Sequence, residues 1–235
     1  NRIYLIRDNT GQKPLYFLID NKTLFFTSEL KGLEFSGIKT KISQEAVSLF
    51  FKLSYIPAPF TIFQNIFKLE KGKYLELNLN DFDHRIISFK RDLNYFELSN
   101  KNFDDKISSF ENLFSEVISD HLISDVENGT LLSGGIDSNI LLSNIDKNLN
   151  SYTVSYSYKG NQSIDSIFAA RRAKQFNISH NEIRVSDDDF FESLEKIIDL
   201  LEEPVGNENV VGNYFLSKNI REKVLFVGDG GDEIF

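Results

Sequence analysis

The sequence contains no cysteine among its 235 residues. Disulfide bonds, zinc–thiolate sites and a cysteine nucleophile are therefore excluded for these residues. Methionine is absent as well, even at position 1, where the translation of an open reading frame begins. We therefore expect the chain to be a fragment or a processed product of a longer protein.

Long apolar runs and a basic excess are also missing. The run Leu49-Phe50-Phe51 is interrupted at Lys52, and no stretch approaches the length needed to cross a membrane. No basic n-region with a following apolar segment suggests secretion, so we expect a cytoplasmic protein. The net charge of −9, with lysine and arginine scattered along the chain, disfavours a nucleic-acid partner.

The chain divides by pattern into two regions. Residues 1–100 contain short β-type runs separated by turn signals, with one helix expected over 44–51 behind Ser43 as N-cap. Residues 101–235 open with a helix expected over 102–122 and then alternate between strand and helix. This alternation predicts an α/β protein, in which a β-rich region precedes a parallel sheet covered by helices.

The individual elements are predicted from apolar periodicity and turn residues. Strands are expected at 2–7, 15–19, 24–27, 74–79, 86–89, 129–132, 152–156, 182–185 and 224–227. Helices of the second region are expected, after the first, at 139–145, 166–176, 190–201 and 213–222.

The most informative stretch is the loop Ser133-Gly134-Gly135-Ile136-Asp137-Ser138, between an expected strand and an expected helix. A strand that turns through two glycines into a helix leaves backbone N–H groups pointing at one spot, backed by the positive end of the helix. The two serine hydroxyls add donors. Because Asp137 would repel a bare phosphate, a bridging cation is expected, and the loop predicts nucleotide phosphate with magnesium.

A second loop of similar composition, Gly228-Asp229-Gly230-Gly231-Asp232-Glu233, follows the expected strand 224–227. In open α/β sheets ligands bind beyond the carboxyl ends of the strands, so the two loops are expected to face one site. Asp137, Asp229 and Asp232 would supply the oxygen ligands that magnesium prefers.

The loops also admit simpler interpretations. Either loop alone is as compatible with a simple tight turn, and the Walker pattern, EF-hand spacing and a G-x-S-x-G elbow are all missing. The histidines, His84, His121 and His180, have no metal-site spacing. The presence of both loops, each directly after an expected strand, favours nucleotide chemistry.

The first loop resembles the pyrophosphate loop of the N-type ATP pyrophosphatases. Together with 121–126 upstream and 228–235 downstream, it is similar to the glutamine-hydrolysing asparagine synthetases. Segments 7–16 and 27–31 resemble the closing part of that family's class II glutaminase domain, and 56–63 with 69–72 resembles the segment after it. The resemblance covers essentially the whole chain in the right order.

The resemblance implies an incomplete Ntn-hydrolase-type glutaminase in 1–100 and a C-terminally truncated ATP-pyrophosphatase-type domain in 101–235. It implies an ATP-dependent carbon–nitrogen ligase whose substrates are aspartate, glutamine and ATP, with Mg²⁺ and a homodimer. The β-carboxylate of aspartate would be adenylated with release of pyrophosphate, and ammonia from glutamine would then displace AMP to give asparagine.

Site residues are carried over from the family position by position. Asp229 is implied in forming the adenylate, and Asp137 and Asp232 in binding magnesium. The pyrophosphate would be held by Ser133, Gly134, Gly135, Asp137 and Ser138, and the adenosine by Leu132, Val154, Val227 and Gly228.

Departures from the family pattern leave alternatives open. The glutaminase nucleophile is an N-terminal cysteine, which this sequence lacks, so the chain alone is not expected to hydrolyse glutamine. Val227 and Asn139 stand where serine is common, and a reaction-centre lysine is expected beyond Phe235. The alternatives are an amidotransferase for another carboxylate, a catalytically silent ATP-binding module, and a tRNA-modifying pyrophosphatase, which the acidic charge disfavours.

Overall fold

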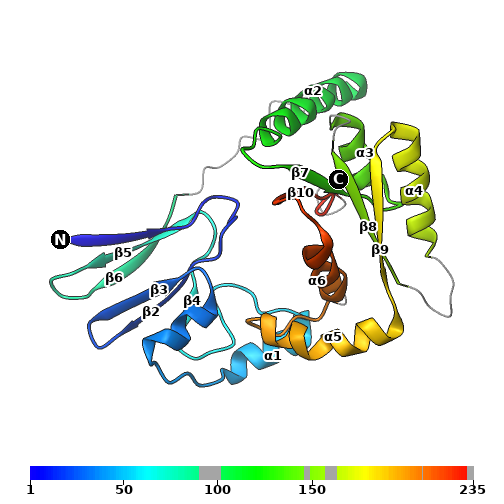
Figure 1. Cartoon of the computed structure of the whole chain (residues 1–235). Coiled ribbons are helices and arrows are strands. Elements are labelled where there is room, and N and C mark those ends of the chain that lie inside the picture. Colours follow the sequence, from blue (N-terminus) through cyan, green and yellow to red (C-terminus); the bar gives the residue numbers. More distant parts are fainter. Residues whose placement is uncertain (90–101, 146–148, 157–162, 208, 232–235) are drawn as a thin grey trace. The chain divides into compact units, whose positions relative to one another are not determined.

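The computed structural model describes residues 1–89, 102–145, 149–156, 163–207 and 209–231. The chain forms two compact units (Figure 1). The first comprises Asn1–Asn94 together with Ile198–Asn207, and the second comprises Tyr95–Ile197 together with Glu208–Phe235.

The first unit contains two three-stranded antiparallel sheets, ordered β1-β5-β6 and β3-β2-β4. The hairpin between β2 and β3 turns through Asn21 and Lys22, both with positive φ, as a two-residue hairpin loop requires. The elements are β1 (Arg2–Ile6), β2 (Tyr16–Asp20), β3 (Thr23–Thr27), η1 (Leu30–Ser36), α1 (Gln44–Leu53), β4 (Phe67–Lys68), β5 (Lys73–Asn78) and β6 (His84–Ser88).

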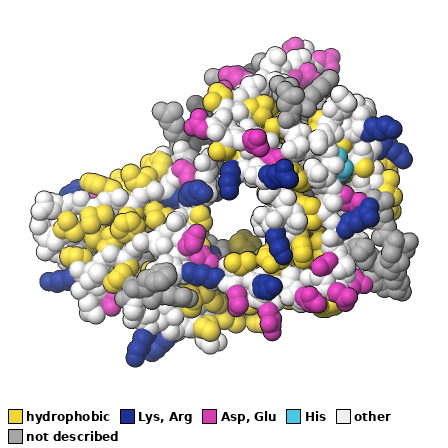
Figure 2. All heavy atoms as spheres, viewed as in Figure 1, with side chains coloured by type: hydrophobic (Ala, Val, Ile, Leu, Met, Phe, Trp, Pro, Cys, Tyr) yellow, Lys and Arg dark blue, Asp and Glu magenta, His cyan; other side chains and the backbone are white. Residues whose placement is uncertain are grey.

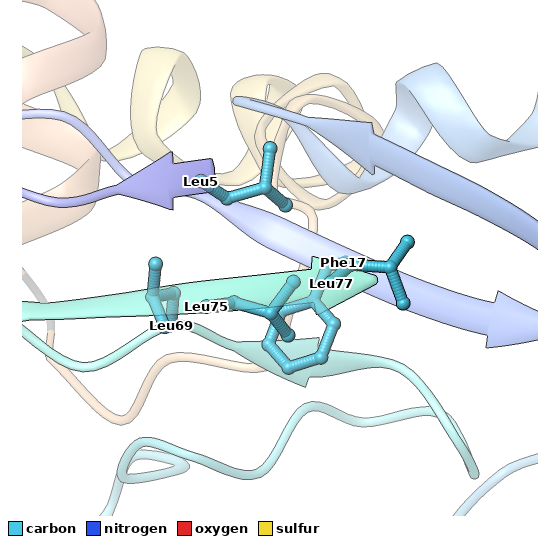
Figure 3. Packing of buried hydrophobic residues seen from close by; sticks show 5 residues of the cluster. All are labelled: Leu5, Phe17, Leu69, Leu75 and Leu77. Atoms are coloured by element: carbon cyan, nitrogen blue, oxygen red, sulfur yellow. The ribbon is translucent and has the colours of Figure 1, made fainter. Parts of the chain in front are cut away.

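Strand β2 is buried on both of its faces. Because side chains alternate along a strand, Phe17 points to one side and Tyr16 and Leu18 point to the other. Phe17 packs in the cluster drawn in Figure 3, with Leu5, Leu69, Leu75 and Leu77. Tyr16 and Leu18 pack in a second cluster with Leu30, Leu33 and Ile66. The first unit therefore builds two hydrophobic cores around one strand.

The opposite face of the β1-β5-β6 sheet is exposed, and Figure 2 shows hydrophobic side chains on the surface of this unit. Tyr4 and Ile6 on β1 are 49% and 63% exposed, and the rings of Tyr4 and Tyr74 lie 6.1 Å apart. Glu76 on the same face pairs with two flanking arginines, Arg2 at 3.2 Å and Arg85 at 2.8 Å. Because the side chains of Arg2 and Arg85 are 53% and 64% exposed, these pairs contribute little to stability.

The turn that follows β1 is held by Arg7 and Asp8. The Arg7 guanidinium donates to the carbonyl oxygens of Leu69 at 2.7 Å and Gly11 at 3.1 Å. The Asp8 carboxylate accepts hydrogen bonds from the backbone N–H groups of Thr10 at 2.9 Å and Gly11 at 2.6 Å, and from the Thr10 hydroxyl at 2.7 Å. The two side chains thus fix the turn from both sides.

The segment Ile198–Asn207 belongs to the first unit although the residues before and after it in sequence belong to the second. Glu203 accepts a hydrogen bond from the backbone N–H of Ile62 at 2.8 Å and forms an ion pair with Lys68. Both charged side chains are only 14% exposed. Burial and the Glu203 carboxylate raise the pKa of Tyr16 to about 12.

Two further contacts attach this segment. Glu202 accepts a hydrogen bond from the backbone N–H of Lys31 at 3.1 Å, and the Gly206 N–H donates to the Ser54 carbonyl at 2.9 Å. A side chain at position 206 would place its Cβ 2.6 Å from the Ser54 Cβ, so the glycine permits this close approach.

The second unit is built around a four-stranded parallel sheet in the order β10-β7-β8-β9. Helices α4 and α6 both contact β8 and β9, and they lie on opposite sides of the sheet (Figure 1). The elements are α2 (Phe103–His121), β7 (Asn128–Leu131), α3 (Ile136–Asn144), β8 (Asn150–Tyr156), α4 (Ile164–Phe176), β9 (Ser179–Val185), α5 (Asp187–Leu200), α6 (Asn209–Asn219) and β10 (Val224–Phe226).

Helix α3 packs on both of its sides. Leu142 joins Leu132 and the alanines of α4, Ala169 and Ala173, in one cluster. Leu141 and Ile145 join Ile118 of α2 in another. The small alanine side chains let α4 pack closely against Leu132, before the loop, and Leu142, in the second half of α3.

The α/β class with a parallel sheet and a β-rich first region is confirmed, as is Ser43 as the N-cap of α1, which accepts from the Ala46 N–H. The helix expected over 213–222 was wrong at both ends, because α6 spans Asn209–Asn219. Glu222 lies beyond the end of the helix, and its carboxylate is bound by side chains of β8. None of the helices in the described ranges combines the length and apolar character that crossing a membrane requires.

The Asp8 turn predicts an acid-sensitive contribution to stability. The hydrogen bond from the Thr10 hydroxyl, aided by backbone N–H groups, lowers the pKa of Asp8 from 3.8 to about 2. A lowered pKa stabilises the fold above pH 3.8, and this stabilisation is lost as the pH falls toward 2. Between pH 3.8 and about 2, the free energy of unfolding measured with denaturant should fall more steeply for the natural chain than for Asp8→Asn. The same pH dependence in both proteins would contradict the prediction.

The Lys68–Glu203 pair predicts a destabilised Glu203→Gln variant. Removing one charge leaves the ammonium of Lys68 nearly buried without its partner, at a cost of about 2 kcal/mol. Urea unfolding measures this cost. The matched control is Lys73→Gln, which breaks the more exposed Lys73–Glu70 pair and should cost below about 1 kcal/mol. Equal losses of unfolding free energy in the two variants would show that burial gives the Lys68–Glu203 pair no additional stabilising effect.

Candidate functional site

The loop Ser133–Ser138 connects β7 to α3 and lies at the carboxyl edge of the sheet. The backbone N–H of Leu132 still donates to Tyr152 of β8 at 2.8 Å, so the chain leaves the sheet only after Leu132. Helix α3 then begins at Ile136, three residues before the expected Asn139. Asp137 and Ser138 therefore belong to the first turn of the helix rather than to a longer loop.

The two serine hydroxyls of this loop bind each other. Ser133 Oγ and Ser138 Oγ are 2.8 Å apart, and Ser138 Oγ also accepts from the Ser133 N–H at 3.2 Å. The Gly135 N–H donates to Ser133 Oγ at 3.1 Å. Ser138 is 6% exposed whereas Ser133 is exposed. Ser138 thus closes the loop from inside, and Ser133 presents the more accessible hydroxyl.

The N-terminus of α3 has no side-chain cap. Gly135 is the N-cap residue, with φ −76° and ψ 162°, and it has no side chain to accept a hydrogen bond. The first N–H groups of a helix have no partner within the helix, and the helix dipole makes this end positive. The start of α3 therefore presents backbone donors suited to an anion.

The second loop lies against the first. A Cβ on Gly228 would stand 2.7 Å from the backbone nitrogen of Ser138 and 2.9 Å from the carbonyl carbon of Asp137. A Cβ on Gly231 would stand 2.6 Å from the Asp137 carboxylate oxygen. Because β7 and β10 are neighbouring parallel strands, the loops that follow them meet at one edge. Gly228 allows the contact with the backbone of Asp137 and Ser138, and Gly231 allows the contact with the Asp137 side chain.

The remaining predicted site residues differ in their surroundings. Leu132 is 2% exposed and packs in the α3–α4 cluster, so its backbone is the part that a ligand would meet. Val154 on β8 lies near Gly212 of α6, since a Cβ added at position 212 would be 3.6 Å from Val154 Cγ1. Val227 is 42% exposed, and Asp229 is also exposed.

The Asp137 carboxylate, on the first loop, lies beside Gly231 of the second loop and is the described group best placed to bind a metal ion between them. Asp232, the second expected magnesium ligand, lies outside the described residues. Among the residues that the structure describes, no group of three histidine or acidic side chains forms a metal site. Where the two loops meet, the described residues thus supply the Asp137 carboxylate and backbone donors, and Asp229 on the second loop is exposed.

Two residues that shape the surroundings of the sheet edge, one beside the first loop and one beside β8, were not identified from the sequence. The Asp165 carboxylate, in the first turn of α4, would be 3.1 Å from a Cβ on Gly134. Its position after a strand of the same sheet was the available signal. Gly212 is an isolated glycine inside a helical pattern. A Cβ added there would be 2.9 Å from the Tyr156 hydroxyl oxygen, so the glycine lets α6 approach that hydroxyl closely.

A shallow cavity of about 280 Å³ lies between α3 and α4. It is lined by Gly134, Ile136, Asn139, Ile140, Ser143, Arg172 and Phe176. None of these residues comes from the second loop. The cavity is therefore separate from the contact between the two loops.

Comparison with protein families gives two matches. The family described as asparagine synthase matches residues 109–235. The family described as glutamine amidotransferase domain matches residues 1–87.

Individual relatives match 99% of this chain. It is 32% identical to a putative glutamine-hydrolysing asparagine synthetase 2 of Methanocaldococcus jannaschii, covering 46% of that protein. It is 27% identical to asparagine synthetase 1 of Bacillus subtilis, covering 37%, and 27% identical to the rat asparagine synthetase, covering 43%. The chain thus spans less than half the length of these relatives.

A solved NH3-dependent NAD synthetase from Campylobacter jejuni matches with a TM-score of 0.31 and 17% identity, covering 49% of this chain and 47% of that chain. A score this low supports no conclusion about fold or function.

The contact between the loops predicts the effect of Gly228→Ala. The added Cβ would overlap the backbone of Ser138, which cannot rotate away, and the variant should lose about 1–3 kcal/mol of unfolding free energy. Amide hydrogen exchange around Ser138 should also increase. Val227→Ala, at the adjacent exposed position, is the control and should leave that exchange unchanged. Equal amide hydrogen exchange around Ser138 in Gly228→Ala and Val227→Ala would contradict the contact between the loops.

Proposed function

The chain belongs to the asparagine synthase family, and we propose that it is part of a glutamine-hydrolysing asparagine synthetase. Residues 1–100 would belong to its glutamine amidotransferase domain and residues 101–235 to its ATP-pyrophosphatase-type domain. The enzyme would be a cytoplasmic ligase that acts on small molecules, and the family resemblance implies a homodimer.

The observation that carries this proposal is the contact of the two glycine-rich loops at the uncapped start of α3. A helix N-terminus at the carboxyl edge of a parallel sheet suits a phosphate group. The close approach of Gly228 and Gly231 to Asp137 supports a single site built from both loops.

The proposed reaction has two steps. The β-carboxylate of aspartate attacks the α-phosphorus of ATP, forming β-aspartyl-AMP and releasing pyrophosphate. Ammonia from glutamine then attacks the activated carbonyl, forming asparagine and releasing AMP. Both the carboxylate and the triphosphate are anions, so the first step needs donors that offset their repulsion.

Each loop has a role in this proposal. The backbone and hydroxyls of Ser133–Ser138 would hold the pyrophosphate, with Ser133 as the accessible hydroxyl. The adenosine would lie against Leu132, Val154, Val227 and Gly228. Asp229 would act in forming the adenylate, since the exposed carboxylate follows directly on the contact residue Gly228.

The described residues fit a magnesium ion in one respect. Asp137 offers a hard oxygen ligand, and Gly231 leaves the space beside that carboxylate free of a side chain. We propose Asp137 and Asp232 as ligands. When bound, magnesium would neutralise part of the phosphate charge.

The ammonia-supplying half raises a separate point. The family resemblance implies a cysteine nucleophile for glutamine hydrolysis, and the sequence contains no cysteine. We therefore propose that residues 1–100 supply the scaffold of that domain and not its nucleophile.

Exchange of labelled pyrophosphate into ATP tests the proposal in the full-length gene product. The natural protein should show exchange that requires aspartate, and Asp137→Asn should lower it by about 100-fold or more, because charge on the phosphates would no longer be offset. Asp125→Asn, which changes an exposed acid outside both loops, is the control.

Two outcomes would contradict the assignment. Exchange that occurs with another added carboxylic acid and not with aspartate would indicate that acid as the substrate. ATP binding without any exchange would indicate a catalytically silent module.

A further inference from the structure

Glu222 is a buried carboxylate outside the two loops. It is 5% exposed and lies between the end of α6 and the start of β10. Its Oε2 accepts a hydrogen bond from the Tyr152 hydroxyl at 2.7 Å, and its Oε1 accepts one from Asn150 Nδ2 at 2.6 Å. The backbone N–H of Arg221 is 3.2 Å from Oε2. A buried charge with this many donors is well satisfied.

The partners of Glu222 are not on the strand next to it. Tyr152 and Asn150 belong to β8, whereas β10 pairs with β7. The side chain therefore reaches across β7 at Gly129. A Cβ on Gly129 would be 3.4 Å from Glu222 Cγ, 2.9 Å from Leu225 Cδ2 and 3.3 Å from the Asn150 carbonyl oxygen. The missing side chain of Gly129 opens this path.

Among the described residues, strand β10 is short, and besides its pairing with β7 it is held by Phe226, which packs against the cluster of Ile118, Leu141 and Ile145. It is an edge strand of three residues, with the register Val224↔Asn128, Leu225↔Gly129 and Phe226↔Thr130. The Thr130 hydroxyl adds one hydrogen bond to the Phe226 carbonyl at 3.2 Å. Short strands with few paired residues specify their register weakly.

The position of β10 determines where the second loop lies. Gly228 follows the strand by two residues, and its backbone touches that of Ser138. A slip of one residue would move the loop by about 3.3 Å. Because a Cβ on Gly228 would already be 2.7 Å from the Ser138 nitrogen, the contact tolerates no such movement.

We propose that Glu222 is a positioning residue for the nucleotide site: by binding Tyr152 and Asn150 it fixes β10, and thereby holds Gly228–Gly231 against the start of α3. The inference rests on the proposed function for its catalytic meaning. Glu222 touches neither loop in this role and acts through the strand.

The protonation states agree with this geometry. Burial alone would raise the pKa of the Glu222 carboxyl, but the hydrogen bonds from Tyr152 and Asn150 outweigh it and lower the pKa. Burial and the bond to Glu222 raise the pKa of Tyr152 to about 12. Near neutral pH the carboxylate is thus ionised and the phenol is a donor.

The test compares three variants of the full-length gene product with a matched control. Glu222→Ala removes both bonds, Tyr152→Phe removes one, and Glu222→Gln retains the size and one acceptor. The control is Ser151→Ala on β8, whose hydroxyl donates to the Ser179 carbonyl at 2.9 Å and lies 3.0 Å from His180 Nδ1. It disturbs the same sheet toward β9 and leaves β10 untouched.

Amide hydrogen exchange is the first measurement. Glu222→Ala should increase exchange in 224–231 by about 10-fold or more relative to Ser151→Ala, with Tyr152→Phe and Glu222→Gln between the two. If Glu222→Ala does not fold, the two milder variants decide the result. Unchanged exchange in 224–231 across all variants would overturn the positioning role.

Pyrophosphate–ATP exchange is the second measurement. Misplacing the second loop should lower kcat/KM for ATP by about 10- to 100-fold in Glu222→Ala, with partial rescue in Glu222→Gln. A residue that only stabilises the fold would lower the unfolding midpoint and leave the kinetics of folded protein unchanged, which would also overturn the inference.

The two proposals fail in different ways. If the natural protein shows no pyrophosphate exchange, the proposed function fails, and hydrogen exchange still decides whether Glu222 fixes the loop. If the natural protein is active and the variants match Ser151→Ala in both measurements, the positioning role alone fails.

Discussion

The contact between the backbone of Gly228 and that of Ser138 is the constraint on which the second unit depends. Neighbouring parallel strands bring their following loops to one edge, but only residues without a side chain allow the two backbones to touch. The α3–α4 cluster places one loop from the helix side, and the bonds of Glu222 place the other from the strand side. The relative position of the two loops thus depends on side chains outside the loops, in the α3–α4 cluster and around Glu222.

The sequence predicted the features that depend on local pattern. The glycine pair before α3, the periodicity of α2 and the cap at Ser43 were all readable, because each depends on residues close together in the chain. The start of α3 was expected too late, since Asp137 and Ser138 read as loop residues. Only the structure shows that Ser138 closes the loop while it belongs to the helix.

Features that depend on distant residues could not be predicted. Glu222 reads as the end of an amphipathic helix, and nothing near it in sequence reveals its partners, 70 and 72 residues away. Gly129 reads as a weak point in a strand, although it allows the carboxylate to cross. The two-residue strand β4 is too short to give a pattern. The roles proposed for Asp229 and Asp232 stay predictions, and the latter lies outside the described residues.

The placement of Ile198–Asn207 in the first unit has a consequence for protein engineering. Neither unit is a continuous stretch of polypeptide, so no single cut of the chain separates them. A recombinant second unit made as one piece would carry Glu202 and Glu203 without the backbone and lysine groups that bind them. A chimera of two relatives joined between the units would have to exchange this segment together with the first unit, since its carboxylates and their partners have to match.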